Sequence, residues 1–316
     1  MNEQQVEQVE QVEQVEQEEL DELTMACSRG DVGTVKQLLS DPDINPSHVT
    51  YQEEHSFTPL FVSCLLGRVE IVELLLNDKR ADVDQTTNLG WTPLFIACFQ
   101  GHVEIVKLLL NDERVDVGKT VNEGSSLHGA CLRGRTEVVK VLLNDKRVEI
   151  NNEEKDGTRA PLYLACWKGY PEVVKLLIAD ERVDVNHEND SGQTAFWMAC
   201  YQGHVEVVKV LLENERVDIN KTNIFGQLPL FVACEEGHIE IVEYILASGR
   251  ELDFISEDED GEERSVFDVA QEFDYVDIIE LLESYENDPI ETRMKLRIQL
   301  NLAGKNSFFN FIFPII

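Results

Sequence analysis

A glycine that recurs at nearly constant spacing is the feature that most constrains this chain. It stands at six positions, which are Gly67, Gly101, Gly134, Gly169, Gly203 and Gly237. Successive glycines are 34, 33, 35, 34 and 34 residues apart. A period of this length is typical of stacked arrays, in which one small unit repeats and buries its apolar face against its neighbours. The sequence therefore predicts a repeat fold with a core that runs along the array.

Residues 90–112 show what one unit contains. The hydroxyl of Thr92 can cap a helix N-terminus, and Pro93 suits the first helical position. Gly101 suits the left-handed conformation at a helix end, and a second short helix is expected over residues 104–110. Isolated helices of this length are marginal in water, so each pair must pack on its neighbours.

The unit resembles the ankyrin repeat, whose signature is Thr-Pro-Leu-His-x-Ala with a period near 33 residues. Parts of this signature stand at residues 58–61, 92–95, 127–130, 161–165 and 229–233, and a Gly-His-x-Glu-x-Val run begins at Gly101, Gly203 and Gly237. The resemblance covers about residues 20–285. It implies an all-α ankyrin-repeat solenoid of about eight units including caps, with paired antiparallel helices and β-turn or finger loops.

Two features depart from the family pattern. The signature histidine remains only as His128, and aromatic residues replace it at Phe61, Phe95, Tyr163, Trp197 and Phe231. The inter-repeat hydrogen bonds that this histidine makes in the family are therefore in question here. The loop after the second helix reads Asn-Asp-Glu-Arg-Val-Asp-Val, which is longer than the family's usual loop and looks like the expanded ankyrin arrays of protists.

The two ends of the chain differ in composition from the array. Residues 1–19 are acidic and of low complexity, with a valine every third residue that makes no stable apolar stripe on a helix. We expect a solvated arm there, with a coiled-coil segment as the alternative. Residues 20–285 hold the array, with a degenerate cap at each end. In residues 286–316 a basic helix, expected from Ile290 to Leu302, precedes a Phe/Ile-rich tail that is too short to span a bilayer.

The net charge of −34 disfavours nucleic acid and anionic membrane as partners of the main surface. Residues 251–291 contain 17 acidic residues and one basic residue. This end of the array should attract a basic surface. That surface belongs either to a partner or to the chain's own Arg293, Lys295 and Arg297.

Seven cysteines occupy the same position in successive units: Cys27, Cys64, Cys98, Cys131, Cys166, Cys200 and Cys234. Neighbours should lie about 10 Å apart if stacked helices pack at ordinary distances, which is too far for a disulfide. We interpret them as small buried hydrophobic residues. Free thiols, together with the expected absence of a signal peptide, predict a cytoplasmic protein.

No sequence motif for catalysis, cofactor binding or metal binding is present. His102, His204 and His238 recur after the glycine, which indicates a structural role. The acidic loop at 257–263 does not fit an EF-hand, because Phe267 would occupy its last ligand position. We therefore expect no enzymatic activity, no cofactor and no metal.

Partner-binding residues follow from the ankyrin resemblance. In that family the two residues before the repeat glycine face a concave groove that contacts partners. By position these are Phe99, Gln100, Leu132, Arg133, Trp167, Lys168, Tyr201, Gln202, Glu235 and Glu236, and apolar residues near predicted finger tips add Leu89, Trp91, Ile224 and Phe225. Large aromatic residues are typical interface anchors. The alternative is that they complete the core and that adjacent fingers cover the tips.

The sequence thus predicts a non-catalytic protein-interaction module, an adaptor, scaffold or inhibitor, that is monomeric alone and binds another protein. An alternative is a peripheral membrane-attached scaffold that uses the basic and Phe/Ile-rich C-terminal segment, the only part expected to contact a membrane. The sequence does not name the partner.

Overall fold

The computed structural model describes residues 21–52, 55–120, 124–152, 160–257 and 263–302. Three predictions therefore lie partly or wholly outside the described residues. They concern the N-terminal arm, the centre of the acidic loop and the Phe/Ile-rich tail.

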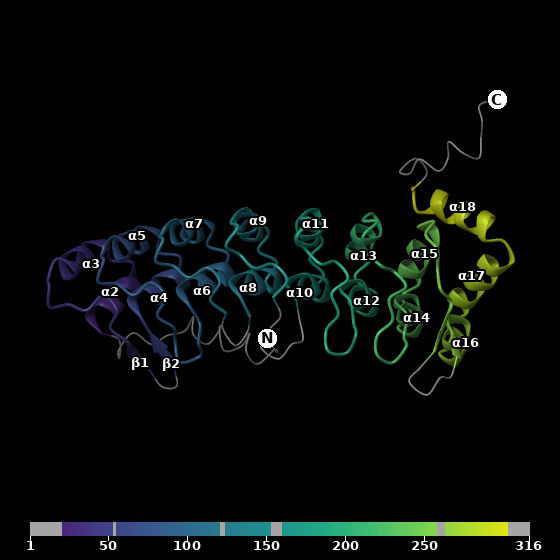
Figure 1. The fold of residues 1–316 in the computed structure, drawn as a ribbon, viewed down its shortest axis with the longest axis horizontal. Helices are drawn as coiled ribbons and strands as arrows, with labels where there is room; N and C mark the ends of the chain where they lie inside the picture. Colours follow the sequence, from purple (N-terminus) through teal and green to yellow (C-terminus); the bar gives the residue numbers. More distant parts are fainter. Residues whose placement is uncertain (1–20, 53–54, 121–123, 153–159, 258–262, 303–316) are drawn as a thin grey trace, which may run out of the picture. The chain divides into compact units, whose positions relative to one another are not determined.

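Within the described residues the chain forms short helices that come in pairs (Figure 1). One compact unit comprises Met1–Lys168 and Ala179–Val183. Its helices are α2 (Glu22–Arg29), α3 (Val32–Leu39), α4 (Pro59–Leu65), α5 (Val69–Asn77), α6 (Pro93–Gln100), α7 (Val103–Asn111), α8 (Ser126–Leu132), α9 (Thr136–Asn144) and α10 (Pro161–Lys168). The second unit comprises Gly169–Ile178 and Asp184–Ile316. Its helices are α11 (Pro171–Ala179), α12 (Ala195–Tyr201), α13 (Val205–Leu212), α14 (Pro229–Glu235), α15 (Ile239–Ala247), α16 (Val266–Glu272), α17 (Val276–Asn287) and α18 (Pro289–Gln299).

Each unit consists of two rows of helices. In the first unit the inner helices α2, α4, α6, α8 and α10 contact one another in sequence, and the outer helices α3, α5, α7 and α9 do the same (Figure 1). In the second unit α12, α14 and α16 form the inner row, and α13, α15 and α17 form the outer row. Neither row could bury its apolar face alone, so the stacking supplies the core.

Two finger loops are β-hairpins. Strand β1 (Thr50–Gln52) pairs antiparallel with β2 (His55–Phe57), and β3 (Ile255–Glu257) pairs with β4 (Glu263–Ser265). The first hairpin is fixed to the next finger, because the Ser56 amide donates to Asn88 Oδ1 at 3.0 Å.

The helix ends follow the local signals in the sequence. Thr92 Oγ1 accepts a hydrogen bond from the Phe95 amide at 3.0 Å, and Pro93 takes the first helical position. Gly101 ends α6 with φ +88°. The degenerate first repeat lacks Thr-Pro, and there the carboxylate of Asp21 caps α2 instead, accepting from the amides of Leu23 and Thr24 at 3.0 and 3.1 Å.

Histidines that follow the glycine join neighbouring repeats. His102 Nε2 lies 3.1 Å from the Leu65 carbonyl oxygen, and His238 Nε2 lies 3.1 Å from that of Tyr201. The His102 ring covers Gly67, where an added Cβ would lie 2.8 Å from His102 Cε1. Gly67 also has φ +70°, so both the close ring and the backbone favour glycine there. The structural role predicted for these histidines is confirmed at both positions.

The seven cysteines are all buried. Desolvation by burial raises the pKa of Cys27 and of Cys234 to about 12. The thiols therefore stay protonated and pack as small apolar groups. Their interpretation as buried hydrophobic residues is confirmed.

Helix α18 continues the second unit beyond the last repeat. It packs against α15 and α17. Arg297 Nη1 donates to the Ala247 carbonyl at 3.1 Å, and Gln299 Nε2 donates to Glu243 Oε1 at 2.9 Å. The helix predicted after residue 289 is therefore present.

Candidate partner-binding surface

Three residues that were predicted to contact a partner lie in the core of the first unit. Phe99 is 0% exposed, Trp91 is 1% exposed and Leu132 is 4% exposed. The ring of Phe95 stacks between those of Trp91 and Phe99, with centroids 6.1 and 6.0 Å away. This burial favours the alternative for these three side chains, in which they complete the core and do not contact a partner.

The neighbouring helix α8 explains why Phe99 is buried. A Cβ added at Gly129 of α8 would lie 3.2 Å from Phe95 Cε2 and 3.5 Å from Phe99 Cβ. Because Gly129 has no side chain, α8 comes close enough to cover the rings of Phe95 and Phe99. Arg133 adds to the cover, with its guanidinium carbon 4.9 Å from the centroid of the Phe99 ring.

The other predicted residues of the first unit are half-buried. These are Leu89, Gln100, Arg133, Trp167 and Lys168. Lys168 Nζ lies 3.8 Å from the centroid of the Trp167 ring, so the two side chains stabilise each other by a cation–π contact.

The second unit exposes an aromatic side chain at the equivalent position. Tyr201 is 39% exposed, and Gln202 beside it is also exposed. The Tyr201 ring stacks on that of Trp197 with centroids 5.4 Å apart. Trp197 is buried, and its Nε1 donates to the Gln227 carbonyl at 3.1 Å. The exposed ring therefore rests on a fixed platform.

The finger tip at residues 224–225 presents two apolar side chains on an ordered backbone. Ile224 is 49% exposed and Phe225 is 53% exposed. The buried Asn223 carboxamide oxygen accepts from the amides of Phe225 and Gln227 at 3.0 and 2.9 Å. The Ile224 amide donates to the Ser191 carbonyl of the preceding finger at 3.0 Å. The preceding finger therefore fixes the backbone of this tip and contacts the Ile224 side chain at Gly192, while both side chains keep the exposure given above.

Two glutamates complete this face. Gln227 Nε2 donates to Glu235 Oε2 at 3.4 Å, which ties the finger to the end of α14. Glu235 is half-buried and Glu236 is exposed. Burial raises the pKa of Glu235 above its ordinary value, and the charge of Glu236 adds to the increase. We call Tyr201, Gln202, Ile224, Phe225, Glu235 and Glu236 the second-unit surface.

Sequence reasoning missed an arginine that joins each repeat to the preceding one. It stands at Arg80, Arg114, Arg147, Arg182, Arg216 and Arg250, with the same successive steps as the glycine. Arg114 shows the geometry: its Nη2 donates to the Leu76 carbonyl at 2.6 Å and its Nη1 to the Ala81 carbonyl at 3.1 Å. Asp112 Oδ2 accepts from the same Nη2 at 2.6 Å. The guanidinium thus satisfies carbonyls at the end of the preceding outer helix, and the equal spacing was the signal that could have revealed it.

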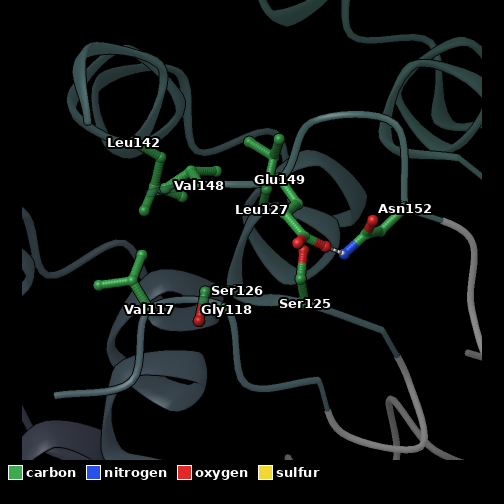
Figure 2. Close-up of a pocket in the computed structure, with 9 residues that line it drawn as sticks. All are labelled: Val117, Gly118, Ser125, Ser126, Leu127, Leu142, Val148, Glu149 and Asn152. Atoms are coloured by element: carbon green, nitrogen blue, oxygen red, sulfur yellow. Dashed lines mark hydrogen bonds between the residues drawn. The ribbon is translucent and has the colours of Figure 1, made fainter. Parts of the chain in front are cut away.

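Polar side chains that line a small pocket in the first unit form hydrogen bonds with nearby residues (Figure 2). It is lined by Val117, Gly118, Ser125, Ser126, Leu127, Leu142, Val148, Glu149 and Asn152. Asn152 Nδ2 donates to Glu149 Oε2 at 2.5 Å, and the Ser125 hydroxyl lies 2.9 Å from Nδ1 of the buried His128 as part of the α8 cap. This arrangement fixes a helix start and a loop, and it gives no basis for assigning catalysis.

Paired short helices, finger loops and a recurring glycine cap define a class of repeat proteins. The chain belongs to the ankyrin repeat family, because the family model described as "Ankyrin repeats (3 copies)" matches residues 23–121, 113–189 and 162–256. Its fold is an all-α ankyrin-repeat solenoid. Among solved structures, the human ASB11 ankyrin repeat domain matches with a TM-score of 0.58 and 26% identity, covering 68% of this chain and 92% of that domain. No curated protein sequence matches the chain.

Ankyrin repeats are in general protein–protein interaction modules and are typically not enzymes, in agreement with the class of function expected from the sequence. Across the described parts of the chain, no helix is both long enough and apolar enough to cross a membrane. The same residues contain no group of three or more histidine, cysteine or acidic side chains placed to hold a metal ion.

Proposed function

We propose that this protein is a non-catalytic adaptor, scaffold or inhibitor that binds another protein through the second-unit surface. The observation that carries the proposal is the exposure of Tyr201, Ile224 and Phe225 on backbone that hydrogen bonds hold in place. Apolar side chains on a fixed framework lose little conformational freedom on binding, so a few of them can supply most of the affinity. The protein acts as a monomer in the cytoplasm.

The predicted groove and finger tips contribute unequally to the proposed binding surface, because the main contacts lie in the second unit. Of the predicted binding residues in the first unit, those outside the core are half-buried, so Trp167 and Lys168 are secondary contacts there. The second-unit surface combines exposed aromatic, aliphatic and acidic side chains. A combination of aromatic and polar contacts is characteristic of protein interfaces.

The test is quantitative affinity capture from a cell extract with the full chain and a Tyr201→Ala/Ile224→Ala/Phe225→Ala variant. Truncating two or three interface anchors removes about 2 kcal/mol or more of binding free energy, so the specific partner should fall at least about tenfold in the variant. Circular dichroism should show unchanged helix content, because none of the three side chains is part of the buried core.

An Ile290→Ala/Ile298→Ala variant is the matched control, because it also truncates exposed apolar residues of the second unit, at 64% and 67% exposure. It should capture the partner as well as the unaltered chain does. A partner captured equally by all three proteins, or by none of them, would contradict the proposed surface.

Helix α18 favours a second candidate, peripheral membrane attachment. Ile290, Met294 and Ile298 follow one another at helical spacing and are 64%, 37% and 67% exposed. They form an apolar stripe on the side of α18 that does not pack on the repeats. The basic residues support this candidate less, because Arg297 donates to the Ala247 carbonyl and Arg293 Nη2 donates to the Tyr285 hydroxyl at 2.9 Å.

Vesicle sedimentation separates the two candidates. If the stripe inserts into the interface, the full chain should pellet with vesicles that contain anionic lipid, and the Ile290→Ser/Ile298→Ser variant should stay in the supernatant. Deleting the whole of α18 is a poorer test, because the helix packs on α15 and α17. Equal sedimentation of the two proteins would rule out the stripe as a membrane contact.

A further inference from the structure

We infer that the second unit binds an extended peptide segment with a lysine or arginine between two apolar side chains. This inference rests on the proposed function and specifies the chemistry of the partner. It extends the second-unit surface by one repeat, to the end of α16.

The first observation is an acidic stretch with an exposed aromatic residue at each end. Glu272 and Phe273 occupy in the last repeat the places that Glu235 and Glu236 occupy in the one before. Asp274 there takes the glycine position with φ 57°. Phe273 is 46% exposed and Tyr201 is 39% exposed. Along the inner row of the unit, the side chains thus change from aromatic to acidic and back to aromatic.

The second observation is a guanidinium that already sits in this acidic stretch. Arg264 comes from strand β4, and its Nη2 lies 2.6 Å from Glu272 Oε2. Its guanidinium carbon lies 5.4 Å from the centroid of the Phe231 ring. An aromatic face next to a carboxylate is a site that selects a cation. Arg264 therefore shows which chemical group fits there.

The third observation is an excess of negative charge that Arg264 does not neutralise. Glu272 pairs with Arg264, Glu235 feels the charges of both, and Glu236 adds a third negative charge beside Glu235. The partial burial of Glu235 and the nearby charge of Glu236 already work against its ionisation. A partner cation would relieve this repulsion, so charge complementarity favours a basic segment over an acidic or neutral one.

The geometry also sets a spacing for the peptide. Adjacent inner helices pack about 10 Å apart, so Tyr201 and Phe273, two repeats apart, are separated by about 20 Å. An extended peptide rises about 3.3 Å per residue, so its two apolar side chains should stand about six positions apart with the basic residue between them. The exposed finger tip at Ile224 and Phe225, which precedes α14 in the middle repeat, adds apolar contact area.

The experiment is selection of a displayed library of random 12-residue peptides on the full-length protein. Enriched peptides should carry lysine or arginine between apolar residues at this spacing. Their binding should weaken at least about tenfold on a Glu235→Gln/Glu236→Gln/Glu272→Gln variant. Added salt should weaken their binding to the unaltered protein, because it screens the same charges.

A second variant gives a change in the opposite direction. Arg264→Ala removes the internal guanidinium that competes for the site, so the same peptides should bind about threefold or more tighter. A side chain with only a structural role would not produce a gain in affinity. Unchanged or weaker binding to Arg264→Ala would overturn the assignment of Arg264 as an occupant of the site.

The outcomes separate this inference from the proposed function. Enriched peptides that depend on Tyr201 and Phe225, but lack basic residues and bind the glutamine variant equally well, would overturn the inference and leave the proposed function standing. The inference and the proposed function both fail if no peptide is enriched. They also both fail if the peptides bind the glutamine variant and a Tyr201→Ala/Phe225→Ala variant as tightly as the unaltered protein.

Discussion

Phe99→Ala is expected to lower the free energy of unfolding by about 3–5 kcal/mol, the usual cost of truncating a buried phenylalanine. The side chain is fully buried and stacks on Phe95. It also supports Arg133, whose guanidinium lies over its ring. Chemical denaturation followed by far-ultraviolet circular dichroism measures the effect.

Tyr201→Ala is the matched control, because Tyr201 holds the same place in its repeat but is 39% exposed. Its truncation should cost about 1 kcal/mol or less, which is typical of a partly exposed side chain. Equal losses for the two substitutions would mean that the predicted groove aromatics share one role, and the distinction between core and surface drawn here would be wrong.

Arg114→Leu is expected to destabilise the protein by about 2–3 kcal/mol. The substitution leaves the carbonyls of Leu76 and Ala81 and the Asp112 carboxylate without the guanidinium. Hydrogen bonds to charged groups contribute about 1.5–3 kcal/mol each, and the 29% exposure of the Arg114 side chain reduces the total. Arg114→Lys should recover only part of the loss, because an ammonium group cannot form the same fork.

The dependence of stability on pH gives a second readout for the same site. The side-chain hydrogen bond from Arg114 holds the pKa of Asp112 below its ordinary value. A carboxyl group with a lowered folded-state pKa stabilises the protein above its unfolded pKa, near 4, and this contribution is lost as the pH falls through the folded-state pKa. In Arg114→Leu this part of the acid dependence should shrink.

Lys146→Leu is the control for Arg114→Leu, because Lys146 is an exposed basic residue in the corresponding loop of the next repeat. Its replacement should change the free energy of unfolding by less than about 0.5 kcal/mol. A similar loss in both variants would indicate a general charge effect and would contradict a specific inter-repeat role for Arg114.

Helix positions were predictable because their determinants are local. Thr92, Pro93 and Gly101 mark the ends of α6 through hydrogen bonds and backbone preferences that involve only nearby residues. The caps of the array were less predictable. Asp21 replaces the missing Thr-Pro by a carboxylate cap, and Asp274 takes the left-handed position of the glycine.

The candidate site was predictable by position but not by exposure. Phe99 and Tyr201 stand at the same place in their repeats, and the family pattern treats them alike. At Phe99 the next inner helix, α8, carries Gly129 and packs closely onto the side chain, whereas Tyr201 stacks on Trp197 of its own helix and stays 39% exposed. Such contacts depend on how the helices pack, which the position in the repeat does not encode.

The sequence by itself determined the repeat length, the paired helices, the glycine caps and the burial of the cysteines, because each depends on periodic local chemistry. The tertiary structure decided which groove residues are accessible, which carbonyls the recurring arginine binds, and where Arg264 lies against Phe231 and Glu272. These contacts join residues from different repeats or from a finger and a helix. They are set by packing distances that no single repeat encodes.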